Sequence, residues 1–212
     1  MTGTVVLVGC GNMGRAMLEG WLASGRLKAG EALVVEPAEA LRARAAALGV
    51  AVVADAREIG ADARPRLVVF AVKPQVIRDV IPAYARFKAG ATYVSVAAGT
   101  PISAFEEGLG AGAAVLRCMP NTPAAIGKGM MVTFANPHVT PEAAAFVADL
   151  LSASGRVAGI ADEALMDAVT AVSGSGPAYV FHFIECLTAA AEAAGLPADT
   201  AKLLAMQTVH GA

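Results

Sequence analysis

A glycine-rich turn near the N-terminus constrains the fold of this chain more than any other feature. It follows the apolar run Val5–Val8, opens a stretch with helical spacing, and reads Gly9, Cys10, Gly11, Asn12, Met13 and Gly14. In a dinucleotide-binding strand–turn–helix unit, the first glycine permits the tight turn, the second lets the backbone approach a pyrophosphate, and the third lets helix and strand pack closely. The helix N-terminus then offers free N–H groups to the phosphates. The turn therefore predicts a dinucleotide site after the first strand.

An acidic residue, Glu36, closes the second apolar run, about 20 residues after Gly14, where such units place a carboxylate. A carboxylate there accepts hydrogen bonds from the ribose hydroxyls and repels a 2′-phosphate. Glu36 therefore favours NADH over NADPH. Arg42 and Arg44 on the following helix are alternative phosphate partners, although a solvated helix face explains them better.

The first two-thirds of the chain alternate between short apolar runs and stretches with helical spacing. The runs are rich in Val and Leu without polar alternation, which is typical of parallel strands covered on both faces. We expect strands at 5–8, 33–35, 67–72, 91–96 and 113–119, with helices at 13–23, 38–48 and 75–87. A strand at 130–134, a helix at 141–153 and a short strand near residue 157 continue the pattern. The alternation predicts a Rossmann-type, doubly wound α/β dinucleotide-binding domain over residues 1–160.

The character of the sequence changes near Ala161, where Ala-rich segments with helical spacing replace the β-branched runs. Helices are expected at 162–172, 177–194 and from 197 to the end. The second is apolar nearly all round, which indicates burial on several sides, and we expect His182 to be a core histidine. About 50 residues cannot enclose such a helix alone. Residues 161–212 are therefore predicted to be a helical dimerisation and substrate domain, incomplete here, that needs a partner subunit or further residues.

The composition argues against several classes of protein. A net charge of −2 with three scattered histidines does not suggest a nucleic-acid surface. Residues 168–191 are apolar and long enough to cross a bilayer, which needs about 20 residues. Gly174, Gly176 and Pro177 interrupt them, so a buried helix is the better interpretation than a membrane span. With no signal peptide pattern at the start, we expect a cytoplasmic protein.

Three cysteines, Cys10, Cys118 and Cys186, lie far apart within apolar segments. They form no CxxC or Cys/His spacing typical of zinc sites, so no metal is expected. We expect all three to be buried, reduced thiols.

Further candidate site residues follow the other predicted strands, because ligands of doubly wound sheets bind at the carboxyl ends of the strands. Small or polar residues follow three of these strands. They are Lys73 and Pro74 after the third, Ala97 and Ala98 after the fourth, and Asn121 and Thr122, framed by prolines, after the fifth. Lys73 is either a cofactor contact or a solvated side chain. Asn121 and Thr122 suit either the wall of a small-molecule pocket or an ordinary turn.

Four motifs, taken together and in order, resemble those of pyrroline-5-carboxylate reductases. They are residues 9–14, 71–75, 119–123 and 167–179, of which the last contains Ser-Gly-Ser-Gly-Pro-Ala-Tyr and is highly specific. The resemblance spans the whole chain. It implies that NAD(P)H delivers hydride to the C=N carbon of 1-pyrroline-5-carboxylate, which is the last step of proline biosynthesis.

The resemblance also implies roles for individual residues. Cofactor phosphates fall on residues 11–13, while residues 71–74 and 96–98 line the nucleotide and nicotinamide site. Glu163 matches a position that faces the substrate pocket, and Asp55 stands where the family often has an adenosine-contacting Asn. The family often has a small or polar residue in place of Glu36. A homodimer through the helical domain is implied, with assembly into higher oligomers as a further option.

In the family, a later Thr-containing loop holds the substrate, and no such loop precedes Ala212. No catalytic residue is therefore assigned within the chain, and a catalytically incomplete dinucleotide-binding fragment is one alternative. Another is a β-hydroxyacid-dehydrogenase-like enzyme, which shares the glycine-rich opening. That family uses a lysine on the helix after its Rossmann domain, whereas no lysine occurs here between Lys128 and Lys202.

Overall fold

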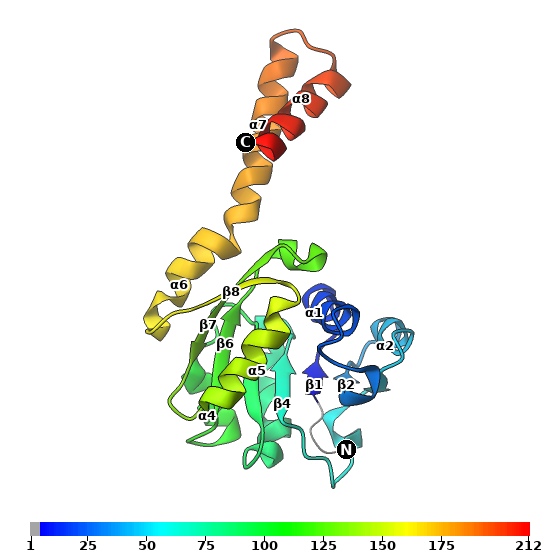
Figure 1. Cartoon of the computed structure of the whole chain (residues 1–212), viewed down its shortest axis with the longest axis vertical. Coiled ribbons are helices and arrows are strands. Elements are labelled where there is room, and N and C mark those ends of the chain that lie inside the picture. Colours follow the sequence, from blue (N-terminus) through cyan, green and yellow to red (C-terminus); the bar gives the residue numbers. More distant parts are fainter. Residues whose placement is uncertain (1–4) are drawn as a thin grey trace.

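An eight-stranded sheet forms the centre of the larger part of the molecule (Figure 1), in a computed structural model that describes residues 5–212. The strand order is β3-β2-β1-β4-β5-β6-β7-β8. The strands are β1 (Val5–Val8), β2 (Ala32–Val35), β3 (Ala51–Val53), β4 (Leu67–Phe70), β5 (Thr92–Ser95), β6 (Val115–Met119), β7 (Gly129–Ala135) and β8 (Gly155–Gly159). All neighbouring strands are parallel except β6 and β7. The predicted doubly wound α/β sheet is thus confirmed, with one antiparallel pair that the sequence pattern did not indicate.

Helices cover both faces of the sheet, because successive residues of each strand point to opposite faces. In β1, Val5 and Leu7 pack with α1 (Asn12–Ala23) and α5 (Pro141–Ser152). Val6 and Val8 pack on the other face with α3 (Pro74–Val80) and α4 (Ile102–Leu109). A short α2 (Glu39–Ala46) follows β2. Two separate apolar cores result, which explains the continuous apolar character of the strands.

Several predicted elements are shorter or differ in type. The strand expected at 67–72 ends at Phe70, and the helix expected at 75–87 becomes a 3-10 helix from Ile81 to Phe87. Pro82 lies at that change and cannot donate the N–H that an α-helix requires. The sequence pattern missed β3, whose three residues are too few to show a period, and also α4.

The last 50 residues form a helical arm that projects from the carboxyl edge of the sheet (Figure 1). The helix expected at 162–172 is instead a 3-10 helix (Glu163–Leu165), a short α6 (Met166–Val169) and a π-helical turn (Thr170–Gly174). Two antiparallel helices follow, α7 (Gly176–Ala193) and α8 (Ala198–Gly211).

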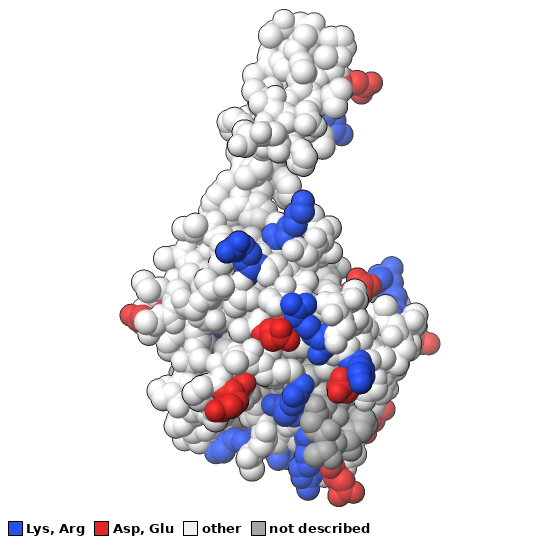
Figure 2. Space-filling model, viewed as in Figure 1, with Lys and Arg blue, Asp and Glu red and all other residues white. Residues whose placement is uncertain are grey.

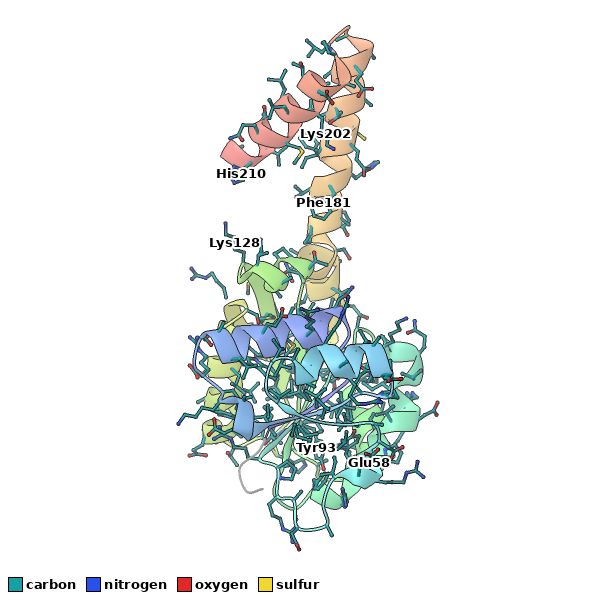
Figure 3. The ribbon with its side chains drawn as sticks, turned by 90° about the vertical axis from the view of Figure 1, so that its right-hand side faces the viewer. Glu58, Tyr93, Lys128, Phe181, Lys202 and His210 are labelled. Atoms are coloured by element: carbon teal, nitrogen blue, oxygen red, sulfur yellow. The ribbon has the colours of Figure 1, made fainter. Side chains whose placement is uncertain are left out.

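Helix α7 carries no buried residue within this chain, because α8 is the main element that packs along it. The expectation that His182 and Cys186 are buried is therefore wrong for the single chain, where both are exposed. Cys10 and Cys118 are buried as expected. Figure 3 shows the contrast between Tyr93, inside the sheet domain, and Phe181, on the arm. Along residues 5–212, none of the helices is both long and apolar enough to be a membrane-span candidate.

Candidate dinucleotide and substrate site

The three glycines of the first turn occupy three different environments. Gly9 has a φ of +88°, and its N–H donates to Val35 O at 2.8 Å. A Cβ on Gly14 would overlap Gly9 O and lie 3.1 Å from Ala71 Cβ, whereas a Cβ on Gly11 would meet nothing within 4 Å. Gly9 thus makes the turn, Gly14 lets helix and strand pack closely, and Gly11 leaves open space. This is the geometry that a bound pyrophosphate requires.

Helix α1 begins at this open space. Gly11 is its N-cap residue, no side chain caps the helix, and its first turn carries no acidic residue. Asn12 is exposed at the entrance and Met13 is half-buried against the core. The N-terminus of α1 therefore presents backbone N–H groups and the positive end of the helix dipole to the space above Gly11, which suits phosphate oxygens.

Glu36 lies directly behind the turn and is only 6% exposed. Its Oε2 accepts the Cys10 N–H at 2.8 Å, and its Oε1 accepts the Ala38 N–H at 2.9 Å. Burial, with a smaller contribution from the Glu36 charge, raises the pKa of the Cys10 thiol to about 11. Glu36 therefore braces the glycine turn, a role that the sequence did not reveal, in addition to any contact with a ribose.

An apolar pocket of about 420 Å³ lies beside Glu36, beyond the ends of β1 and β2. Val8, Val35, Pro37 and Val76 contribute to its walls, and the acidic residues Asp55 and Asp79 also line it. Hydrogen bonds from Arg57 lower the pKa of the Asp55 carboxyl to about 2. The size and apolar walls of this pocket suit an adenine ring, and its position next to the turn suits the adenosine half of a dinucleotide.

The residues after β4 and β5 lie along the same edge of the sheet. Ala71 N–H donates to Val8 O at 2.8 Å, and Val96 N–H donates to Phe70 O at 3.1 Å, so both segments continue from the glycine turn. Val72 and Val96 are half-buried, Ala97 is buried, and Ala98 is half-buried. Lys73 and Pro74 are exposed, with Pro74 the first residue of α3. The structure thus brings the predicted cofactor residues to one edge.

Asn121 and Thr122 follow β6 at this edge but face different surroundings. Asn121 Nδ2 donates to Ser173 O at 3.0 Å, and Asn121 Oδ1 accepts the Met130 N–H at 2.9 Å. Its side chain therefore ties the π-helical turn to the sheet. Thr122 is exposed, and no hydrogen bond of its hydroxyl occurs among the described residues.

Glu163 binds the sheet domain at the base of the arm. Its Oε1 accepts hydrogen bonds from Arg117 Nη1 at 2.7 Å and from the Ile102 N–H at 2.8 Å, at the start of α4. The Arg117 side chain is 10% exposed and that of Glu163 is 29% exposed. Both line a pocket of about 380 Å³ together with Gly99 and Asp167, just beyond the end of β5.

Arg117 is the member of this group that sequence reasoning missed. It stands within the apolar run Val115–Met119, where a charge is rarely buried without a partner. An arginine within an apolar run could have been recognised as a buried charge that needs a partner. The sequence does not identify Glu163 as that partner, because the two residues are far apart in it.

Comparisons with known families assign both parts of the chain. Residues 4–99 match the family of NADP oxidoreductases described as coenzyme F420-dependent. Residues 163–212 match the family described as pyrroline-5-carboxylate reductase dimerisation. These matches coincide with the glycine-turn part of the sheet and with the helical arm.

Individual relatives agree with the family matches. A pyrroline-5-carboxylate reductase of Pseudomonas aeruginosa is 40% identical over 213 residues, which cover 100% of this chain and 77% of the relative. That of Escherichia coli is 36% identical, covering 96% of this chain and 76% of the relative.

Solved structures show the same likeness in three dimensions. A pyrroline-5-carboxylate reductase from Coxiella burnetii has a TM-score of 0.90 and 32% identity, covering 100% of this chain and 78% of the other. The Plasmodium falciparum enzyme with NADP bound has a TM-score of 0.83 and 28% identity, covering 98% and 76%. Because the glycine turn, the edge residues, the arm and these relatives all agree over the whole chain, the chain belongs to the pyrroline-5-carboxylate reductase family.

Proposed function

We propose that this protein reduces 1-pyrroline-5-carboxylate to proline with hydride from NAD(P)H, in the last step of proline biosynthesis. The observation that carries the proposal is the open glycine turn, which stands at the same sheet edge as residues 96–98 and Thr122. Relatives that align with 96% to 100% of the chain bear the name of this enzyme.

The residues fit a bound dinucleotide as follows. Residues 9–14 would hold the pyrophosphate, the pocket beside Glu36 the adenosine, and residues 71–74 and 96–98 the nicotinamide side. When bound, the reduced nicotinamide supplies the hydride. The carbon of a C=N bond is already electrophilic, so the protein mainly aligns donor and acceptor. Orientation of this kind supplies roughly 7–11 kcal/mol.

We further propose that the substrate lies beyond the ends of β5 and β6, next to Glu163, Asn121 and Thr122. Thr122 is exposed just after β6, and its hydroxyl has no hydrogen-bond partner among residues 5–212, so we assign it as a donor to the substrate. The side chains of Glu163 and Asn121 are already hydrogen-bonded to the protein, so they shape the walls of the pocket and hold the arm.

For the cofactor, we propose a preference for NADH. The Glu36 carboxylate would stand close to the ribose hydroxyls and repel a 2′-phosphate. The Glu36→Gln variant retains an amide oxygen that can accept one of the two N–H groups, while Glu36→Ala retains neither acceptor. We expect Glu36→Gln to lower the NADH/NADPH ratio of kcat/KM, whereas Glu36→Ala weakens binding of both cofactors. An unchanged ratio in Glu36→Gln would argue against the preference.

The helical arm supports a homodimer. Its apolar side chains Tyr179, Val180, Phe181 and Phe183 are 45–60% exposed in the single chain, and the arm matches a dimerisation family. Assembly into higher oligomers and a cytoplasmic location stay predictions.

Oxidation of NADH and NADPH by this 212-residue chain, with and without 1-pyrroline-5-carboxylate, tests the function. Turnover that depends on the substrate is the expected result, with Gly11→Ala as a folded control impaired in cofactor binding. Cofactor binding without turnover would favour the alternative of a catalytically incomplete fragment. A likeness to a solved 3-hydroxyisobutyrate dehydrogenase, with 20% identity and a TM-score of 0.63, shows the fold alone.

A further inference from the structure

A second pocket lies at the opposite end of the sheet from the candidate site. It has a volume of about 550 Å³ and adjoins the segments that lead into β4 and β5. In Figure 1 this is the end away from the helical arm, and Figure 2 shows Lys and Arg side chains on that end. Three arginines and several small residues line it: Arg64, Arg66, Arg86, Ala61, Ala63, Pro65, Phe87, Ala89 and Gly90.

The pocket combines three positive charges with no carboxylate in its lining. Within the described chain, no acidic oxygen lies within 4.0 Å of the Arg64, Arg66 or Arg86 guanidinium, although five other arginines form such pairs. Of the neighbouring acids, Glu58 accepts the Asp55 N–H at 3.0 Å, and Asp62 is exposed without an ion pair. Residues 1–4, Met-Thr-Gly-Thr, contain no acidic side chain.

Two of the guanidinium groups are held in place by the backbone. Arg86 Nη2 donates to Ile59 O at 2.8 Å and Ala56 O at 3.2 Å, and Arg86 Cζ lies 4.6 Å from the Phe87 ring centroid. Arg64 Nη1 donates to Ala63 O at 2.9 Å and Ala61 O at 3.1 Å.

The Arg64 and Arg86 guanidinium groups each retain N–H donors that are available to a ligand. Nε and one terminal nitrogen of each have no hydrogen-bond partner among residues 5–212. Such fixed, planar donors match phosphate or carboxylate oxygens, and little side-chain freedom remains to be lost on binding.

We propose that this pocket binds a small organic anion bearing phosphate or carboxylate groups, at a site separate from the dinucleotide site. Arg64 and Arg86 contact the acidic groups, and the alanines with Phe87 contact the carbon skeleton. The site touches the segments that precede β4 and β5, whose other ends carry residues 71–74 and 96–98. A ligand there would stabilise the same two strands that position the candidate cofactor residues.

Binding of two probes to the 212-residue chain tests the proposal without any measurement of activity. Inorganic pyrophosphate and citrate represent the phosphate and carboxylate sources, and calorimetric titration is run on the original chain and on the Gly11→Ala variant. The added methyl group of Gly11→Ala occupies the pyrophosphate space of the glycine turn and leaves the arginine pocket intact. We expect saturable binding of at least one probe that persists in Gly11→Ala, and the stronger probe identifies the anion class.

Variants locate the site. The double change Arg64→Gln and Arg86→Gln is expected to weaken binding at least tenfold. Arg156→Gln removes an exposed arginine on β8 that forms no ion pair within residues 5–212, and we expect it to leave probe binding unchanged. Ala89→Glu places a carboxylate at the pocket wall without disturbing the arginine contacts, so it gives the same loss even where the double variant folds poorly. Probe binding that is equal in the original chain, the double variant and Ala89→Glu, or that is absent in Gly11→Ala, would overturn the proposal.

Discussion

Gly11 and Gly14 belong to the same turn, but a side chain would fit at the first position and would clash at the second. A Cβ at Gly11 meets nothing within 4 Å, and the φ of this residue, −68°, suits any amino acid. A Cβ at Gly14 overlaps Gly9 O. The first glycine therefore matters for what binds, and the second for how the protein packs.

This difference yields a prediction from two matched variants. We expect Gly11→Ala to keep the free energy of unfolding within about 0.5 kcal/mol of the original while NADH affinity falls about tenfold, because the new methyl group occupies the pyrophosphate space. Gly14→Ala should destabilise the chain by about 1–3 kcal/mol even without cofactor. Urea unfolding and NADH fluorescence titration measure the two quantities. Loss of stability in Gly11→Ala would contradict the assignment.

Glu36 shows how far sequence reasoning extends at this scale. Its place after the second strand was predictable, because the spacing from the glycine turn is characteristic of the fold. Its hydrogen bonds to Cys10 N–H and Ala38 N–H were not, since they depend on the local path of two loops. A pattern identifies a residue type at a position and leaves its partners open.

At the scale of elements, Glu163 and Arg117 join the arm to the sheet. Glu163 also accepts the Ile102 N–H, at the positive end of α4. The Glu163 carboxylate, at the base of the arm, thus binds both strand β6, through Arg117, and the start of helix α4. Because the Arg117 side chain is only 10% exposed, removal of its partner leaves a poorly solvated charge.

We therefore expect the two residues to be energetically coupled. Glu163→Gln and Arg117→Met should each destabilise the chain by about 1–3 kcal/mol, and the double variant should cost less than the sum. A double-mutant cycle by urea unfolding measures the coupling, which we expect within about 0.5–3 kcal/mol. As a control, the pair of Arg78 and Glu107, with side chains 61% and 67% exposed, should show weaker coupling. Additive effects for Glu163 and Arg117 would show that the contact is dispensable.

The elements that the sequence predicted well are those with a clear hydrophobic periodicity or a continuous run of apolar residues. Strands β1, β2, β4, β5 and β6 fall within two residues of their predicted bounds, since continuous Val and Leu runs mark buried parallel strands. The π-helical turn Thr170–Gly174 was missed, because its contact with Asn121, which donates to Ser173 O, joins residues far apart in the sequence. A Cβ on Gly174 would lie 2.5 Å from Met119 Cε, the flexible end of that side chain, so Met119 would have to move aside.

At the scale of the whole molecule, the chain is a compact sheet domain with an arm that has little contact with it beyond its base (Figures 1 and 3). The sequence predicted that α7 needs partners, and the structure shows why: α8 covers only part of its surface. The apolar side chains left exposed are too many for an isolated helical hairpin in water.

A single substitution on the arm tests this argument. Phe181 is 60% exposed on α7, and a two-fold interface would contain it twice. Burial of one aromatic side chain contributes about 1.5–3 kcal/mol, so Phe181→Glu should weaken dimerisation by a hundredfold or more. Light scattering at micromolar concentration should give a dimer for the original chain and a monomer for the variant. Val76→Glu, a similar change at a 46% exposed site on α3, should leave the mass unchanged because α3 belongs to the sheet domain. A monomeric original chain, or a dimeric Phe181→Glu variant, would mean that this face of the arm is not the dimer contact.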